Sequence, residues 1–204
     1  MRLRLNRPVL FTAVFLTTLL LTACQTEEPP PGTPVGNQPA ATTQSIDGEP
    51  FDIVMSVLTS PRCSNCHPTA DQPLQRDEQI PHLFNVTRGE ENHAGPVQTC
   101  DTCHHEENNL YSNVPGAPHW GLAPQSMGWH GLTDAEVVAA LLDPAKNGGR
   151  THEDLLHHMS EDPLVLWAWE PGNGRTPPPV SHEQFIQSLE AWLAAGALIP
   201  TETE

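Results

Sequence analysis

Apolar side chains recur at helical spacing soon after the first quarter of the chain and again through its last third. The first run consists of four such residues: Phe51, Val54, Met55 and Leu58. Pro50 directly precedes this run and suits the first turn of a helix, and Pro61 follows it closely. The pattern predicts a short helix that begins near Pro50 and ends before Pro61.

Three more helices are predicted in the last third. Residues 133–136 (Thr-Asp-Ala-Glu) have the pattern of a capping box, and the apolar run behind them stops at Pro144. A second apolar face runs from Thr151 to Met159. Residues 181–184 (Ser-His-Glu-Gln) form another capping pattern and open a helix that ends at Gly196. These elements predict a mainly α fold with a helical C-terminal portion.

Residues 61–131 lack such periodicity, yet one five-residue pattern occurs there twice. The two copies are Cys63-Ser64-Asn65-Cys66-His67 and Cys100-Asp101-Thr102-Cys103-His104. Cys-x-x-Cys-His is the attachment site of a c-type haem, because its two thiols bind the two vinyl groups of one porphyrin and its His binds the iron. The sequence therefore predicts two c-type haems, attached through Cys63, Cys66, Cys100 and Cys103, with His67 and His104 as proximal iron ligands.

The composition of residues 61–131 fits this interpretation, because a stretch rich in Pro, Gly and Asn rarely packs alone and the haems could supply its core. We expect residues 51–204 to form a single haem-organised c-type cytochrome domain with long loops. A zinc module of four cysteines is the alternative for paired Cys-x-x-Cys patterns. The two histidines that follow the pairs, and export to an oxidising compartment, argue against zinc.

The first residues have the organisation of an export signal. Arg2, Arg4 and Arg7 supply positive charge before an apolar run at residues 9–21. The run closes in Leu-Thr-Ala-Cys24, which resembles the cleavage box of bacterial lipoproteins. The resemblance implies that residues 1–23 are a signal peptide and that Cys24 carries the lipid. With Gln25 next to it, the resemblance also implies an exported lipoprotein of the outer membrane, facing the periplasm or the cell surface.

Residues 24–50 are predicted to be a flexible tether behind the lipid. They are rich in proline and almost free of apolar side chains before Ile46, so they cannot bury enough surface to offset the entropy of ordering. The chain has five cysteines, one for the lipid and four for two haems, and none is left for a disulfide.

The sequence does not identify the residue that would bind as sixth ligand to each iron. His82 and His93 are the favoured distal ligands, because both lie between the two motifs, where the chain must fold back over a haem. The alternatives are His119, Met127, His158 and Met159. A second imidazole would lower the reduction potential, and a methionine would raise it.

Two further residue types are candidates for haem contacts. Arg62, Arg150 and Arg175 could pair with haem propionates, or form surface ion pairs instead. The five tryptophans could pack on haem edges and exclude water, or be ordinary core aromatics: Trp120, Trp129, Trp167, Trp169 and Trp192.

The charge balance indicates which partners the chain would bind. The chain has nine Lys and Arg residues and 25 Asp and Glu residues, which gives a formal net charge of −16. Such a field repels nucleic acid and favours docking to a redox protein with a basic patch.

Several stretches together resemble a bacterial family of exported dihaem proteins often labelled isoquinoline 1-oxidoreductase subunits. They are residues 60–63 (Ser-Pro-Arg-Cys), 81–82 (Pro-His), 143–151 (Asp-Pro-Ala-Lys-Asn-Gly-Gly-Arg-Thr), 162–165 (Asp-Pro-Leu-Val) and 167–169 (Trp-Ala-Trp). The resemblance spans roughly residues 60–193 and implies an electron-accepting partner of a molybdenum-containing hydroxylase.

These observations leave two classes of function. Only 32 residues separate His67 from Cys100, so we expect the haems to lie close together, as suits an electron carrier between periplasmic or outer-membrane partners. The alternative is a small haem enzyme of the peroxidase or reductase type, with one iron open to substrate.

Overall fold

The computed structural model describes residues 49–89, 92–95 and 98–199. The expected signal peptide, the lipid-bearing Cys24 and the tether up to residue 48 lie outside the described residues. The chain divides after Ala40, and every described residue belongs to the unit from Ala41 to Glu204. Within the described part of the chain, every helix is too short or too polar to cross a bilayer.

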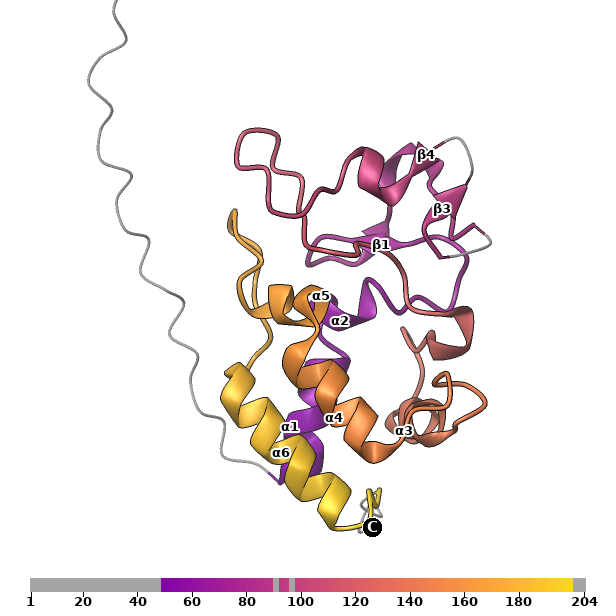
Figure 1. Ribbon diagram of the computed structural model, residues 1–204, viewed down its shortest axis with the longest axis vertical. Helices are drawn as coiled ribbons and strands as arrows, with labels where there is room; N and C mark the ends of the chain where they lie inside the picture. The colour runs from indigo at the N-terminus through magenta and orange to yellow at the C-terminus, as the bar shows by residue number, and fades with distance from the viewer. Residues whose placement is uncertain (1–48, 90–91, 96–97, 200–204) are drawn as a thin grey trace, which may run out of the picture. The chain divides into compact units, whose positions relative to one another are not determined.

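The first and last helices pack against each other. Helix α1 (Pro50–Leu58) begins with Pro50 in its first turn, as predicted, and helix α6 (His182–Ala194) begins after Ser181, whose Oγ accepts the backbone N–H of Gln184. The two helices lie side by side (Figure 1). Phe51 of α1 meets Trp192 of α6 with ring centroids 6.1 Å apart. This helix pair holds together the two ends of the described chain.

Helices α3 (Asp134–Leu142) and α4 (His152–Glu161) also have the predicted bounds, to within one or two residues. Each is opened by a complete capping box, Thr133 with Glu136 and Thr151 with Asp154. The turn between them is built on Asn147, which is almost fully buried. Its Nδ2 donates to the carbonyls of Leu141 (2.9 Å) and Arg150 (3.0 Å). The Asn-Gly-Gly-Arg stretch therefore forms a turn that the side-chain hydrogen bonds of its own asparagine stabilise.

A short helix α5 (Pro163–Leu166) follows α4 and runs into the 3-10 turn η4 (Trp167–Trp169). Asp162 caps α5 by accepting the backbone N–H of Leu164 at 2.9 Å. The periodicity of the sequence did not predict this helix, because four residues are too few to show a repeat.

Between residues 61 and 131, the described part of the chain contains only short elements. They are α2 (Pro61–Ser64), β1 (Leu74–Gln75), β2 (Ile80–Pro81), η1 (Leu83–Asn85), β3 (Ala94–Gly95), β4 (Gln98–Thr99), η2 (Cys100–Thr102) and η3 (Gln125–Met127). Strands β1 and β2 pair antiparallel, with Leu74 opposite Pro81, and so do β3 and β4, with Ala94 opposite Thr99. The strands are few and short, so the prediction of a mainly α fold is confirmed.

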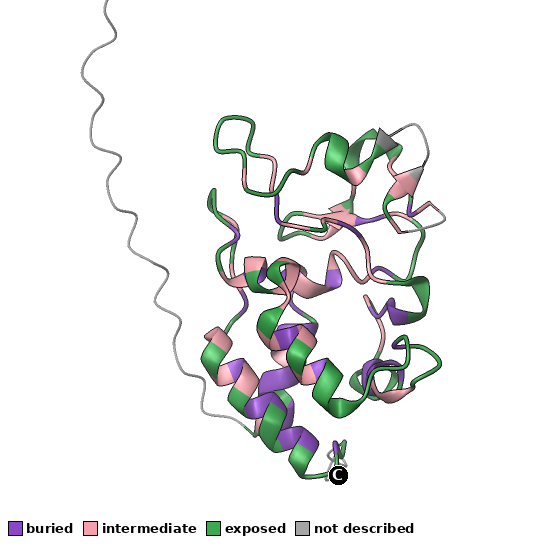
Figure 2. Cartoon of the chain, in the orientation of Figure 1, coloured by how far each residue is buried: buried purple, intermediate pink, exposed green. Residues whose placement is uncertain are grey.

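The hydrophobic core lies among the helices. Buried positions concentrate on α1 and on the faces of the helices packed around it (Figure 2). Residues 61–131 add little to this cluster beyond Met127 and Trp129. The irregular segment is instead tied together by polar groups. Arg88, which is 4% exposed, donates to the carbonyls of Pro68 and Ala123.

Candidate functional site

The first Cys-x-x-Cys-His motif begins in α2 and leads the chain away from the helical core. Its last residue, His67, stacks on Trp129 with ring centroids 3.5 Å apart and the planes 14° from parallel. The Nδ1 atom of His67 lies 2.7 Å from the carbonyl oxygen of Met127. The indole of Trp129 is fixed in turn, since its Nε1 donates to the carbonyl of Leu58. His67 is therefore held on one face and at one ring nitrogen.

The second motif repeats this arrangement with different partners. His104 stacks on Trp120, with centroids 4.6 Å apart and planes 7° from parallel, and its Nδ1 lies 2.7 Å from the carbonyl oxygen of Pro115. Trp120 meets Trp167 edge to face at 4.9 Å. The two motif histidines thus share one environment: an indole on the face and a backbone carbonyl at Nδ1.

This environment determines which ring nitrogen is free. A carbonyl oxygen can only accept, so the Nδ1 atoms of His67 and His104 must carry the hydrogens. Burial, opposed by the bond to Met127, lowers the pKa of His67 to about 3, and burial likewise lowers the pKa of His104. Both rings are therefore neutral near pH 7, and each keeps a lone pair on Nε2. A neutral imidazole held at Nδ1 by a carbonyl is the usual form of a metal-binding histidine.

Both carbonyl partners are followed by a glycine that is closely approached by backbone. A Cβ on Gly116, after Pro115, would lie 2.3 Å from the carbonyl oxygen of Glu107. A Cβ on Gly128, after Met127, would lie 2.4 Å from that of Pro68. Only glycine lets these loops come close enough for their carbonyls to reach the motif histidines.

A cavity of about 570 Å³ brings parts of both motifs together. Cys66 of the first motif and Cys100, Cys103 and His104 of the second motif line it, together with His82. Leu83 and Phe84 also line it, although their side chains are 51% and 81% exposed. The volume lies within the range of about 300–1,000 Å³ that is usual for cofactor sites.

The two cysteines of the first motif are partly buried. Burial raises the pKa of Cys63 to about 12 and that of Cys66 to about 11. Cys63 packs against the hydrophobic core, and the thiol of Cys66 is near enough to Cys100 for their charges to interact. Within the first motif, Cys66 is therefore the cysteine that lies near the second motif.

Two of the three predicted arginines line this cavity, and Arg62 is the more buried. The Arg62 side chain is 3% exposed, pairs with Asp77 and lies over the ring of Trp167 at 5.9 Å. Its Nε is buried and has no hydrogen-bond partner within the described residues. Arg175 also lines the cavity, but its guanidinium donates to carbonyls of Asn113, Pro171 and Gly172. Arg150 lies elsewhere, at an exposed position beside α4.

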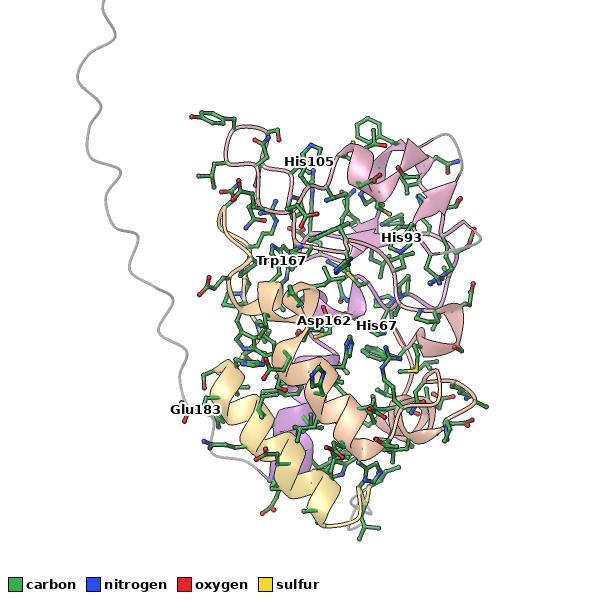
Figure 3. The ribbon with its side chains drawn as sticks, viewed as in Figure 1. His67, His93, His105, Asp162, Trp167 and Glu183 are labelled. Atoms are coloured by element: carbon green, nitrogen blue, oxygen red, sulfur yellow. The ribbon has the colours of Figure 1, made fainter. Side chains whose placement is uncertain are left out.

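The two favoured distal candidates lie in different surroundings. His82 follows strand β2 and its ring centroid lies 6.0 Å from that of His104, at 65° between the planes. His93 lies against Trp120 and Gly121, with its Nδ1 3.3 Å from the Trp120 carbonyl. Figure 3 labels His93 in the irregular segment and His67 nearer the helices.

The alternative candidates lie next to helix α4 or in the hydrophobic core. His158 of α4 has its Nδ1 3.2 Å from Asp162 and is near enough to His67 to affect the pKa of that histidine. His119 lines a second cavity, of about 550 Å³, that also holds His158. The side chains of Met127 and Met159 belong to the hydrophobic core.

The tryptophans divide between the two roles that the sequence left open. Trp120 and Trp167 line the cavity, whereas Trp129 and Trp192 are buried in the core. Trp169 packs on Phe185 and His182 of α6.

The donors of each motif are those that a covalently attached haem requires. Among the described residues, groups of three or more His, Cys, Asp or Glu side chains that could hold a metal ion are absent. A porphyrin supplies four nitrogen ligands itself and needs only one or two from protein. Here each motif offers two thiols and one imidazole with a free Nε2.

Sequence reasoning did not identify the groups that support the motif histidines. The carbonyls of Met127 and Pro115 are backbone atoms, which every residue has, so no side-chain pattern marks them. Arg88 and Asn108 were also missed; Asn108 accepts the Nε1 hydrogen of Trp167 and the backbone N–H of Gly116. The sequence signal that could have pointed to these carbonyls is the glycine that follows each of them.

Comparisons with known proteins give no relative. No family model matches the chain, and neither the curated proteins nor the solved structures contain a match to it.

Proposed function

We propose that this chain is a dihaem c-type cytochrome that carries electrons and is held at a membrane by a lipid on Cys24. The two haems would be attached through Cys63 and Cys66, and through Cys100 and Cys103. His67 and His104 would bind the irons through Nε2. The observation that carries the proposal is that both motif histidines donate Nδ1–H to a backbone carbonyl and lie flat on a tryptophan.

The haems supply the redox chemistry when bound, and the chain's own residues have three tasks. The carbonyls of Met127 and Pro115 orient the proximal rings and make their Nε2 atoms better donors. Trp120 and Trp167 keep water from the cavity wall. Arg62, whose Nη2 already pairs with Asp77, would donate its unpartnered Nε–H to a haem propionate.

A haem count tests the cofactor directly. We expect the full chain, produced in a host that matures c-type cytochromes, to contain two haems per chain in a pyridine haemochrome assay. Both should stay bound after denaturation, because thioether bonds survive it. Replacing Cys66 or Cys103 by Ser should leave one haem on a single thioether. A folded but colourless protein would refute the proposal.

A separate substitution tests the lipid anchor. Cys24→Ser should keep both haems but move the protein from the membrane fraction to the soluble fraction. If Cys24→Ser stays at the membrane, the anchor is not at this residue.

The competing function is a small haem enzyme with one open iron. An electron carrier with six ligands on each iron should bind carbon monoxide slowly or not at all when reduced. Rapid binding at one haem would favour the enzyme. The family resemblance in the sequence implies a more specific role for an electron carrier: the electron-accepting subunit of a molybdenum hydroxylase.

A further inference from the structure

We propose that His82 is the second axial ligand of the haem held by His104, so that this iron is bound by two imidazoles. The inference rests on the proposed function, and it assigns a residue to one particular haem, which the sequence left open.

Local structure fixes the position of His82. The hairpin of β1 and β2 pairs Leu74 with Pro81, and the chain continues from this pair directly into His82. The backbone N–H of His82 donates to the carbonyl of Pro73 at 2.8 Å, and its own carbonyl accepts from Gln72 at 2.9 Å. The residue is therefore held at the wall of the cavity that Cys100, Cys103 and His104 also line.

The ring of His82 is hydrogen-bonded in the same way as the rings of His67 and His104. Its Nδ1 lies 2.7 Å from the carbonyl oxygen of Leu83, which can only accept a hydrogen bond. Nδ1 therefore carries the hydrogen, and in the neutral ring Nε2 keeps the lone pair. His82 and His104 thus both have the tautomer that binds a metal through Nε2.

The separation of the two rings leaves room for one metal ion between them. Metal–imidazole bonds of about 2.0–2.1 Å, with the offset of each nitrogen from its ring centre, put the centroids about 6 Å apart. The centroids of His82 and His104 are 6.0 Å apart. The angle of 65° between the planes is no obstacle, because two axial rings can rotate independently about their common axis.

The other candidates are less well placed for this iron. His119 lines the second cavity, together with His158, rather than the cavity that His104 lines. His93 lies against Trp120 and Gly121 rather than against the ring of His104. The side chains of Met127 and Met159 are part of the helical core. His158 is associated with His67 and Asp162, and therefore with the other motif.

The test is His82→Ala in the full, haem-loaded chain, with His93→Ala as the matched control. His82→Ala should keep two haems per chain in the haemochrome assay, while one of them loses its second imidazole. The near-infrared charge-transfer band and the electron paramagnetic resonance spectrum of the oxidised protein report that loss. After reduction, carbon monoxide should bind one haem per chain, and added imidazole should restore the wild-type spectrum. His93→Ala should keep both imidazoles on the haem held by His104.

A second substitution covers the case in which His82→Ala does not accumulate. His82→Met can still bind iron, so it should give one haem with the His/Met spectrum and a raised reduction potential. Two haems with an unchanged spectrum in either His82 variant would overturn this assignment while leaving the proposed function intact. So would His93→Ala if it removed the second ligand of the haem held by His104. Wild-type protein without haem would overturn both proposals.

Discussion

At the scale of single residues, the backbone does as much at this site as the side chains. The imidazoles of His67 and His104 are oriented by the carbonyls of Met127 and Pro115. A donor held in this way is more basic, and a more basic axial ligand stabilises oxidised iron. If the two proposed haems bind here, the two loops that carry the carbonyls are expected to tune their potentials separately.

The glycines after these carbonyls provide a matched pair of variants. Gly116→Ala would force the Pro115 loop away from the backbone of Glu107, and so weaken the hydrogen bond to His104. We expect the reduction potential of that haem to rise in a redox titration, with the other potential unchanged. Gly128→Ala should act in the same direction on the haem of His67 alone. If both substitutions shift the same potential, or neither shifts any, the carbonyls do not tune the ligands.

The sequence marks the motif residues, because Cys-x-x-Cys-His is a pattern of five positions, and their binding of haem stays a prediction. It does not mark their supporting groups, because Met127 lies 60 residues from His67 and contributes only a carbonyl. His82 shows an intermediate case. The sequence placed it among the candidates, but only the fold gives its distance from His104.

At the scale of elements, helices α1 and α6 position the first motif. Helix α1 leads through Ser60 into α2, which carries Cys63, and the hydrophobic core under α1 is completed by α6. These helices were predictable because their apolar faces repeat over nine residues or more. Helix α5 and the hairpins were not, because they are too short for a period to appear.

The contact of α6 with the core gives a test of stability. Leu189 is 1% exposed, and Leu189→Ala should lower the free energy of unfolding by about 2–5 kcal/mol, since it removes buried methyl groups and leaves a cavity. Chemical denaturation followed by circular dichroism measures the loss. Glu190→Ala, at the exposed neighbouring position, should change the free energy by less than about 0.5 kcal/mol. Equal effects of the two changes would mean that α6 does not pack as described.

At the scale of the whole molecule, the net charge of −16 governs encounters with other molecules. A strongly acidic surface attracts cations from a distance and repels anions, and dissolved salt screens both effects. For an electron carrier, this sets the rate at which partners arrive.

Ionic strength should therefore change electron-transfer rates in opposite directions for probes of opposite charge. With a small cationic complex such as hexaammineruthenium, the bimolecular rate constant should fall about tenfold or more as salt is raised from roughly 10 mM to 1 M. With hexacyanoferrate, an anion, it should rise. Stopped-flow absorbance of the haems measures both. Equal salt dependence for the two probes would show that the overall charge does not steer the encounter.

The depth of the Cys63 and Cys66 sulfurs constrains the order of events during biogenesis. A thiol adds to a vinyl carbon most readily as the thiolate, and burial raises the pKa of these two groups far above neutral pH. Once the polypeptide has closed over them, both thiols are held in the protonated form. If the proposed porphyrins are attached here, their ligation is therefore expected before the chain has fully closed.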